Sequence, residues 1–569
     1  MRSNAPANPA KVAGLQSVAS KTNHDDSSNV LELSPTVALT LGESALLVSG
    51  IRPVGHADLV LQVRTDSADS EAPTRFCERL LTNWSFPAPQ GPPTSIPYYN
   101  ILWAETTTED GGHLRIDFAE EISSHRLSAR NVKFAIATLP AETSTSDSSV
   151  DIAPWVEQLL DRAYGNAARR KRAWVLVNPH AGPGGADKIW EKQVKPIFEA
   201  ARMPMTVIRT TYSGEAVELA KDVNIDDYDI AVPCSGDGLP HEVFNGLAKR
   251  PDARRALSKI AVCHIPCGSG NAMSCNLYGT HRPTLAALAI VKGVPTPLDL
   301  VSVTQGEKRT VSFLSQALGL IADLDLTTEP LRWMGPQRFT YGFLVLAMKR
   351  KVYPCDIAVK VEIEHKEGVK EHYRQRVTGT LSESDTTGQK ALDGTTSENE
   401  CSGDSSQASE DGPGLPPLRY GTVTDKLPDG WELIPHEKLG NFYCGNMAYM
   451  APDTNFFSAA LANDGLMDLI TVDGDISPFK IIQLQLSVES GHFFDSPLVN
   501  YRKVSAYRIV PRKPDPHGYV SIDGERIGFE PFQAEVHKGL GLTLSRRGVF
   551  EAPGPRNWDR FSNSERLRA

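Results

Sequence analysis

Three glycine-rich segments, each directly after a short apolar run, most constrain how this 569-residue chain can fold. They are residues 177–186 (VNPHAGPGGA), 235–238 (SGDG) and 266–272 (PCGSGNA). Helical patterns follow them, so the region from residue 173 to about 291 alternates strand and helix, which predicts an α/β lobe with a mostly parallel sheet. Turns that join such strands to helices meet at the carboxyl edge of the sheet, where ligands bind.

The middle segment places one carboxylate, Asp237, between two glycines. Glycine lets backbone N–H groups come close to a phosphate, and an aspartate beside them can accept the proton of an alcohol. The segment therefore favours phosphoryl transfer to a hydroxyl group. A ligand-free turn between a strand and a helix is the alternative for a motif this short. Residues 177–186 are not a P-loop, because the Gly-Lys-Ser/Thr ending is absent.

Charge and cysteine content exclude several classes of protein. The net charge of −10 argues against a general nucleic-acid binder, which is usually basic. The eight cysteines lack the paired spacing of a zinc site, so we expect buried, reduced thiols and a cytoplasmic protein.

We find no signal peptide, and no run approaches the ~20 apolar residues that span a bilayer. Any membrane contact is then expected to be peripheral, and the oligomeric state stays open.

Composition also divides the chain into regions. The predicted regions are a disordered tail at 1–35, a small β domain at 36–145, the α/β lobe at 166–294, an antiparallel β-sandwich lobe at 295–550 and a C-terminal tail at 551–569. Residues 380–417 interrupt the second lobe. They lack Ile, Val, Phe, Trp, Tyr and Met and carry eight acidic residues against one basic residue, so we expect a disordered acidic insert.

The glycine segments, in this order and spacing, resemble the diacylglycerol-kinase-type catalytic domain of lipid kinases. Within that superfamily, the longer string at 235–247 (SGDGLPHEVFNGL) resembles the sphingosine, or long-chain base, kinases. Residues 319–325 (GLIADLD), with the stretch that continues to residue 339, resemble the segment that binds the lipid head group in those enzymes. Residues 521–525 (SIDGE) resemble the last motif of the family. The resemblance spans roughly residues 173–545 apart from the acidic insert.

This resemblance implies ATP and Mg²⁺ as cofactors, a sphingoid base as substrate, and a role for each matching residue. Asp237 matches the general base. The nucleotide-contacting positions match Asn178, Pro179, His180, Thr211, Tyr212, Ser213, Gly214, Glu215, Glu242, Gly268, Ser269, Gly270, Arg332, Arg338, Asp523, Gly524 and Glu525. The substrate-binding positions match Ser235, Gly236, Asp237, Gly238 and Asp325. Among these, Asp325 matches the carboxylate that binds the ammonium group of the substrate. Which residues bind the Mg²⁺ stays unknown.

Several alternatives stay open at this point. Arg332 and Arg338 also suit surface salt bridges, and Asp325 also suits a helix or turn cap. Pro330 departs from the family pattern and puts the placement of Arg332 in doubt. The apolar stretch at 313–326 suits either an acyl-chain pocket or ordinary core. A kinase for a neutral lipid and a catalytically silent lipid-binding scaffold are the alternative functions.

The predicted β domain at 36–145 is not explained by the catalytic motifs. From its strand pattern alone we interpret it as a membrane- or regulator-binding module of pleckstrin-homology-like type. The basic run at 169–172 suits either anionic lipid or a solvated helix end.

Overall fold

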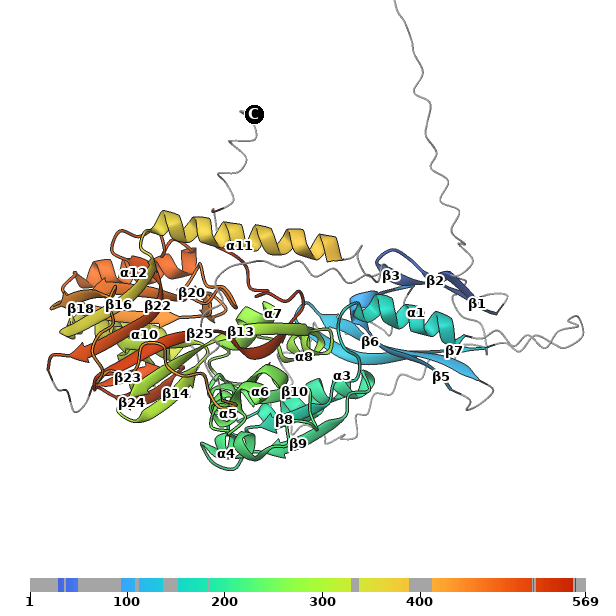
Figure 1. Cartoon of the computed structure of the whole chain (residues 1–569). Coiled ribbons are helices and arrows are strands. Elements are labelled where there is room, and N and C mark those ends of the chain that lie inside the picture. Colours follow the sequence, from blue (N-terminus) through green and yellow to red (C-terminus); the bar gives the residue numbers. More distant parts are fainter. Residues whose placement is uncertain are drawn as a thin grey trace, which may run out of the picture.

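The computed structural model describes residues 29–34, 37–49, 94–107, 112–136, 152–182, 184–328, 337–387, 412–513, 515, 518–555 and 558. The N-terminal strands lie at one end of the molecule and the antiparallel lobe lies at the other, with the α/β lobe between them (Figure 1). The predicted class, an α/β lobe followed by an antiparallel β lobe and preceded by a smaller β region, is confirmed.

The N-terminal region consists of two antiparallel sheets and a helix. The first sheet contains β1 (Val30–Ser34), β2 (Val37–Leu41), β3 (Ala45–Ser49) and β4 (Ser95–Pro97); the second contains β5 (Ile101–Thr107), β6 (His113–Ser123) and β7 (Arg126–Ala135), and α1 (Ala153–Tyr164) follows. Strand β1 corrects the prediction of a disordered tail to residue 35. It forms because Leu31 and Leu33 alternate into the core. Residues 1–28 and 50–93 of the predicted tail and β domain lie outside the described residues.

The α/β lobe is built on a parallel sheet, as predicted. Its strands are β8 (Ala173–Val177), β9 (Met205–Arg209), β10 (Ile230–Ser235), β11 (Ala261–Val262) and β12 (Ile265–Pro266), in the order β11-β10-β8-β9 with β12 also paired to β10. Its helices are α2 (Ala186–Ile189), α3 (Lys195–Ala200), α4 (Glu215–Asp222), α5 (Gly238–Ala248), α6 (Ala253–Lys259), α7 (Ala272–Tyr278) and α8 (Pro283–Val291). Strands β11 and β12 are separated only by Cys263 and His264.

The second lobe is one antiparallel sheet of eleven strands. They are β13 (Val294–Gln305), β14 (Lys308–Ser312), β15 (Ser315–Gly319), β16 (Cys355–Ile363), β17 (Glu432–His436), β18 (Leu439–Gly445), β21 (Met467–Asp473), β22 (Asn500–Pro511), β23 (Tyr519–Ile522), β24 (Glu525–Gly528) and β25 (Phe532–Ser545). Strands near opposite ends of the hydrogen-bonded path, β13 and β23, contribute Val303 and Ile522 to one core. The sheet therefore folds over on itself, as a sandwich requires.

The helices of this lobe are α9 (Leu320–Thr327), α10 (Gln337–Lys349), α11 (Lys366–Thr387) and α12 (Pro478–Ser490), and a small hairpin is formed by β19 (Tyr449–Ala451) and β20 (Thr454–Asn455). Helix α11 corrects the boundary of the predicted disordered insert, because it continues through residues 380–387. Val369 anchors its first turn in the core, and no proline stops the helix afterwards. Residues 388–411 of the insert lie outside the described residues, and 412–417 form a loop.

Six cysteines fall in the described part of the chain, and each is a buried free thiol: Cys234, Cys263, Cys267, Cys275, Cys355 and Cys444. This agrees with the prediction of reduced thiols, while Cys77 and Cys401 lie outside the described residues.

No helix within the described ranges is both long and apolar enough to cross a membrane.

Candidate active site

The three glycine-rich segments meet at the carboxyl edge of the parallel sheet, after β8, β10 and β12. A Cβ atom on Gly268 would lie 2.3 Å from the Cα atom of Gly236, and one on Gly182 would lie 2.8 Å from the carbonyl oxygen of Cys267. Such distances are too short for any side chain, so glycine is required where these backbones touch. The structure thus brings the three segments into direct contact.

Asp237 lies at the start of α5, and its carboxylate is held by the next helix along the edge. Its Oδ2 atom accepts the N–H of Ala272 at 2.8 Å and its Oδ1 atom accepts the N–H of Met273 at 2.9 Å, both at the start of α7. The side chain is 11% exposed. Burial raises the pKa of Asp237 above its ordinary value, although His264 and the two N–H groups oppose the rise. The carboxylate is therefore fixed in position and more basic than a solvated aspartate.

His264 lies behind Asp237 and was not singled out from the sequence. Its Nε2 atom donates to the carbonyl oxygen of Ser235 at 3.0 Å, because a carbonyl can only accept. Its Nδ1 atom lies 3.8 Å from Oδ1 of Asp237 and has no hydrogen-bond partner in the described structure. Burial lowers the pKa of His264 below its ordinary value, and the neighbouring Asp237 carboxylate opposes this shift. A lone histidine within the apolar run at 260–265 was the available signal.

The loop of Gly268, Ser269 and Gly270 is held from within its own turn. Asn271 accepts the N–H of Gly268 at 3.0 Å and donates to its carbonyl oxygen at 2.8 Å. The carbonyl oxygen of Gly270 accepts the N–H of Asp237 at 3.2 Å. The loop and the turn at Asp237 consequently form one hydrogen-bonded unit.

The predicted nucleotide residues after β8 and β9 lie along the same edge. Asn178 accepts the N–H of His180 at 3.0 Å, which shapes the turn that also contains Pro179. Glu215 accepts the N–H and the hydroxyl of Thr211 at 2.5 and 2.9 Å, which closes the turn through Tyr212, Ser213 and Gly214.

The carboxylate of Glu242 on α5 accepts hydrogen bonds from the loop after β9. Its Oε1 atom accepts the N–H of Gly214 at 3.0 Å and its Oε2 atom accepts the N–H of Ala216 at 3.2 Å. These are N–H groups at the start of α4, which have no partner inside the helix. Glu242 therefore fixes α4 relative to α5.

Asp523 and Gly524 form the two-residue turn between β23 and β24, and both have positive φ, 52° and 87°. This is the geometry of a type I′ hairpin. The buried carboxylate of Asp523 accepts hydrogen bonds from the Ser312 hydroxyl and from the N–H groups of residues 313, 314 and 315, and it pairs with Nδ1 of His241 at 2.8 Å. These bonds hold the two-residue connection between β14 and β15. Burial opposes a charge on His241, but the bond to Asp523 outweighs it and raises the pKa of His241.

The last motif also reaches the first lobe through two further contacts. A Cβ atom on Gly238 would lie 3.3 Å from Oε1 of Glu525, so this carboxylate borders the turn that carries Asp237. Asn245 of α5 accepts the N–H of Val311 at 2.9 Å and donates to its carbonyl oxygen at 2.8 Å. The two lobes are thus joined on either side of α5.

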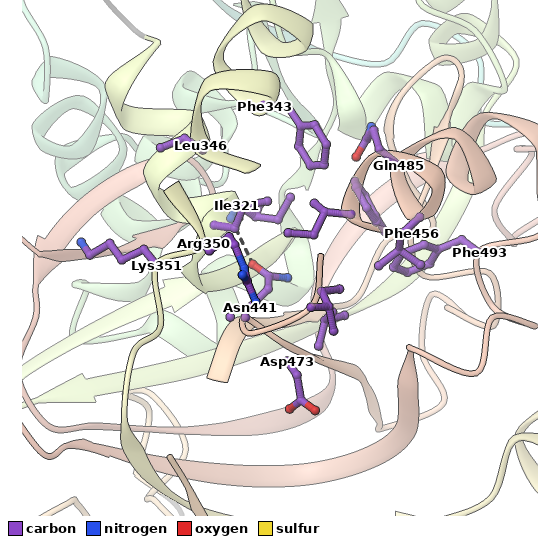
Figure 2. A pocket seen from close by; sticks show the side chains of 17 residues that line it. Ile321, Phe343, Leu346, Arg350, Lys351, Asn441, Phe456, Asp473, Gln485 and Phe493 are labelled. Carbon is purple, nitrogen blue, oxygen red and sulfur yellow. Dashed lines mark hydrogen bonds between the residues drawn. The ribbon is translucent and has the colours of Figure 1, made fainter. Parts of the chain in front are cut away.

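An apolar pocket lies between α9, α10 and α12 in the second lobe. Figure 2 shows the ring of Phe343 on α10 above Ile321 of α9, with Phe456 and Phe493 at one side, and Leu346 also lines the pocket. Asn441 accepts the N–H of Ile321 at 3.0 Å at its base, and Arg350 and Lys351 lie at its edge (Figure 2). The free space is about 60 Å³. Of the stretch at 313–326, Leu320 and Ile321 line the pocket, while Phe313 is buried elsewhere, against Phe244 of α5.

Three predicted site residues are not placed by these contacts. Asp325 lies in α9 and Arg338 in α10, and the side chains of both lie outside the description; Arg332 lies wholly outside it. Within the described residues, no group of three or more His, Cys, Asp or Glu side chains could hold a metal ion.

Comparison with known proteins decides the family. The model of the diacylglycerol kinase catalytic domain matches residues 172–303. The chain is 35% identical over 461 residues to sphingoid long chain base kinase 5 of Saccharomyces cerevisiae, which covers 75% of this chain and 66% of that protein. It is 32% identical over 463 residues to sphingoid long chain base kinase 4 of Schizosaccharomyces pombe, covering 80% of this chain and 89% of that protein. This chain belongs to the sphingoid long-chain base kinase family.

The family resemblance predicted from residues 235–247 and the other motifs is therefore confirmed. Human sphingosine kinase 1 is also similar, at 29% identity over 419 residues, which cover 68% of this chain and 94% of that protein. The N-terminal region matches a different model, a domain of unknown function (DUF7493), over residues 29–165. That match includes α1 as well as both N-terminal sheets.

Proposed function

We propose that this chain transfers the γ-phosphate of ATP to the primary hydroxyl of a sphingoid long-chain base. The observation that carries the proposal is the position of Asp237, held between glycine-rich loops at the carboxyl edge of the sheet in a chain of this family. The relatives are named for activity on sphingoid bases, which supports the choice of substrate.

Asp237 acts as the general base in this proposal. The O–H bond of the substrate breaks as its oxygen forms a bond to the γ-phosphorus, the proton passes to the Asp237 carboxylate, and ADP leaves. In a loose phosphoryl-transfer transition state this proton moves late, so positioning matters more than strong basicity. The N–H groups of Ala272 and Met273 supply that positioning.

The nucleotide binds along the loops after β8, β9 and β12, with Asn178, Thr211 and Gly268 to Gly270 beside the phosphates. Glu242 and Asp523 have a different part in this proposal from the direct contact implied by the family pattern. Their carboxylates are already occupied by the chain's own N–H groups, so they position the loops rather than touch the nucleotide. Arg332 and Arg338 neutralise the transferred phosphoryl group.

Mg²⁺, when bound, neutralises charge on the triphosphate. The described residues contain no group of three or more His, Cys, Asp or Glu side chains that could hold a metal ion, so no protein ligand is assigned to it.

The alkyl chain of the substrate enters the apolar pocket between α9, α10 and α12, and Asp325 of α9 binds the ammonium group. A pocket of about 60 Å³ is far below the ~300–1,000 Å³ of typical ligand sites, so these helices must separate to admit a long chain. A carboxylate in an apolar site favours a cation over a neutral lipid, because an unpaired buried charge is costly.

Peripheral membrane association is supported by the surface beside this pocket. Tyr341 and Met348 of α10 are 55% and 69% exposed, and Phe479 and Leu486 of α12 are 75% and 59% exposed. Large apolar side chains exposed near basic residues such as Lys349 and Lys480 are typical of a surface that contacts lipid. A lipid substrate would then enter directly from the membrane.

For the N-terminal region we keep the proposal of a pleckstrin-homology-like module. Its four-stranded and three-stranded sheets followed by α1 support this arrangement. Vesicle co-sedimentation of the full chain and of a chain lacking residues 29–165, with kinase turnover as the folding control, checks the role. Equal retention of two active proteins on anionic vesicles would contradict it.

One assay tests the main proposal. The full chain is incubated with labelled ATP and with a panel of long-chain bases, diacylglycerol, ceramide and monoacylglycerol. Phosphorylation of the bases alone is expected, and phosphorylation of the neutral lipids would favour the alternative. Asp325→Asn separates the two further, since it should impair only the cationic substrates. Unchanged sphingosine phosphorylation in Asp325→Asn would refute the ammonium assignment.

A further inference from the structure

His264 is a buried side chain at the catalytic edge to which the proposed mechanism gives no role. It lies between β11 and β12, and its residue is 0% exposed. Its ring lies behind Asp237, with Nδ1 at 3.8 Å from Oδ1 of that carboxylate. A side chain this close to the proposed base can take part in the proton transfer, so the position of its hydrogen matters.

The contacts of the His264 ring fix which nitrogen carries that hydrogen. Nε2 lies 3.0 Å from the carbonyl oxygen of Ser235, and Nε2 must donate because a carbonyl oxygen can only accept. In an uncharged ring, Nδ1 is then a lone-pair acceptor. Burial lowers the pKa of His264, which favours this uncharged form. The nitrogen next to Asp237 is therefore the acceptor of the ring.

This acceptor is unsatisfied, because Nδ1 of His264 has no hydrogen-bond partner within the described part of the chain. A buried polar atom without a partner is costly and uncommon in folded proteins. The ionised carboxylate of Asp237 cannot supply a hydrogen, and its two oxygens already accept the N–H groups of Ala272 and Met273. Two acceptors thus face each other across 3.8 Å, and one proton would join them.

A second Asp–His pair at the same edge shows the joined arrangement. Nδ1 of His241 lies 2.8 Å from the carboxylate of Asp523, which also accepts the hydroxyl of Ser312. The hydrogen of that pair is therefore on Nδ1, and the bond is already made. The pair of His264 and Asp237 lacks such a bond and is longer by about one hydrogen-bond contraction.

We propose that His264 is the acceptor for the proton that Asp237 takes from the substrate hydroxyl. The substrate O–H bond breaks as its oxygen bonds to the γ-phosphorus, the proton forms an O–H bond at Oδ1 of Asp237, and this O–H donates to the lone pair on Nδ1. A movement of about 1 Å closes the contact to hydrogen-bond length. His264 acts through Asp237 and is therefore a positioning residue. This inference rests on the proposed function, in which Asp237 is the base.

The two sets of contacts to Asp237 then act at different stages of the transfer. The N–H groups of Ala272 and Met273 stabilise the ionised carboxylate and lower its pKa, so they hold the base before the reaction but oppose its protonation. The lone pair of His264 stabilises the protonated carboxyl group instead. Asp237 can therefore stay in place in both protonation states.

Two substitutions separate this role from a purely structural one. His264→Gln places an amide near the position of Nε2, so it can keep the bond to the Ser235 carbonyl, but it has no acceptor at the position of Nδ1. It should lower kcat about tenfold and leave the KM values for ATP and sphingosine within about twofold. His264→Asn places an amide oxygen near the position of Nδ1 and should keep more of kcat than His264→Gln. If His264→Gln instead keeps full kcat, or the order of the two variants is reversed, the proposal is wrong.

His537→Gln is the matched control, because His537 is also a buried histidine with Nε2 in a hydrogen bond, 2.9 Å from the Ser302 hydroxyl. It should turn over like the unaltered chain, and binding of ATP reports folding in every variant. An equal loss of kcat in His537→Gln and His264→Gln would show general damage from replacing a buried histidine and would overturn the proposal.

A double-mutant cycle with Asp237→Asn tests whether His264 acts through the base. Adding His264→Gln to Asp237→Asn should change the residual kcat by less than about twofold, since no carboxyl group remains to be stabilised. Losses that multiply would mean that His264 acts independently of Asp237. If Asp237→Asn itself keeps full turnover, the proposed function has failed. If it loses turnover while His264→Gln keeps it, only this inference fails.

Nitrogen-15 NMR of the histidine-labelled chain gives a test that does not depend on the folding of His264 variants. The ring of His264 is recognised by its response to Asp237→Asn, and its Nδ1 should show the chemical shift of a nitrogen without hydrogen at neutral pH. A hydrogen on Nδ1 would remove the acceptor and overturn the proposal.

Discussion

The catalytic edge of the parallel sheet and the apolar pocket of the second lobe are organised in opposite ways. At the edge, the carboxylates of Asp237, Glu242 and Asp523 all accept backbone N–H groups, and glycine backbones touch directly. The pocket between α9, α10 and α12 has few polar partners and about 60 Å³ of free space. The edge is therefore ordered without substrate, whereas in the proposed function the pocket has to widen before it can hold an alkyl chain.

This difference follows the chemistry of the two halves of the proposed substrates. Phosphoryl transfer depends on groups fixed within a fraction of an ångström, which hydrogen bonds to backbone provide. An alkyl chain has no directional contacts, and apolar side chains can repack around it at modest cost. Substitutions at the edge should accordingly have larger effects than substitutions in the pocket.

The largest effect is expected from Asp237→Asn. Because Asp237 is the general base in the proposed mechanism, its loss should lower kcat on the order of 10³-fold while ATP still binds. Radiometric turnover and nucleotide binding measure the two properties, and Asp222→Asn on exposed α4 is the control for an aspartate change. Retention of full turnover in Asp237→Asn would show that this residue is not the base.

The next effect tests whether the edge is rigid. In Gly268→Ala the new Cβ would lie 2.3 Å from the Cα atom of Gly236, so both loops must shift and kcat/KM should fall roughly 100-fold. Gly185→Ala is the matched control, because its Cβ meets nothing within 4 Å and its φ is −117°. Similar kinetics for the two alanine variants would contradict a preorganised edge.

Asp523→Asn tests the connection between the lobes. An amide cannot accept the same set of N–H and hydroxyl hydrogen bonds, so the free energy of unfolding should fall by about 2–3 kcal/mol. Chemical denaturation measures this loss, with exposed Asp429→Asn as the control. If both variants unfold at the same denaturant concentration, the turn at Asp523 does not hold the lobes.

Phe343→Trp tests the pocket that must open. A larger ring in about 60 Å³ of space should raise KM for long-chain bases around tenfold and affect short-chain analogues less. Met348→Trp on the exposed side of α10 is the control. A KM that rises equally for short and long chains would place the alkyl chain elsewhere.

The smallest effect concerns pH. Because burial raises the pKa of Asp237, the ionised base should be lost as pH falls through a value above the ~3.9 of a free aspartate. The acid limb of kcat/KM should therefore lie above that value and should be absent from the binding of ATP alone. An acid limb at or below the pKa of a free aspartate would show that the protein does not raise the pKa of Asp237.

Local pattern predicted the framework of the site but not its cross-links. Apolar runs that end in glycine were enough to predict β8, β10 and β12 and the meeting of their turns. The partners of Asp523 lie more than 200 residues earlier in the chain, and no local pattern indicates such a pairing. In the sequence, His264 has the pattern of an ordinary core residue within an apolar run. Only the distance of 3.8 Å between its Nδ1 atom and Oδ1 of Asp237 distinguishes it from a core residue. Strand β1 was missed for a related reason, since a short strand in a polar tail depends on a partner sheet.

The turn at Asp523 also has a consequence for synthesis of the protein. Its hydrogen bond with His241 joins residues 282 positions apart, and it comes from a hairpin that follows most strands of the antiparallel lobe. A nascent chain that has already released the whole α/β lobe from the ribosome still lacks the group that orients α5 against the second lobe. The contact between α5 and the second lobe can therefore form only after residue 523 has been synthesised, long after the α/β lobe itself.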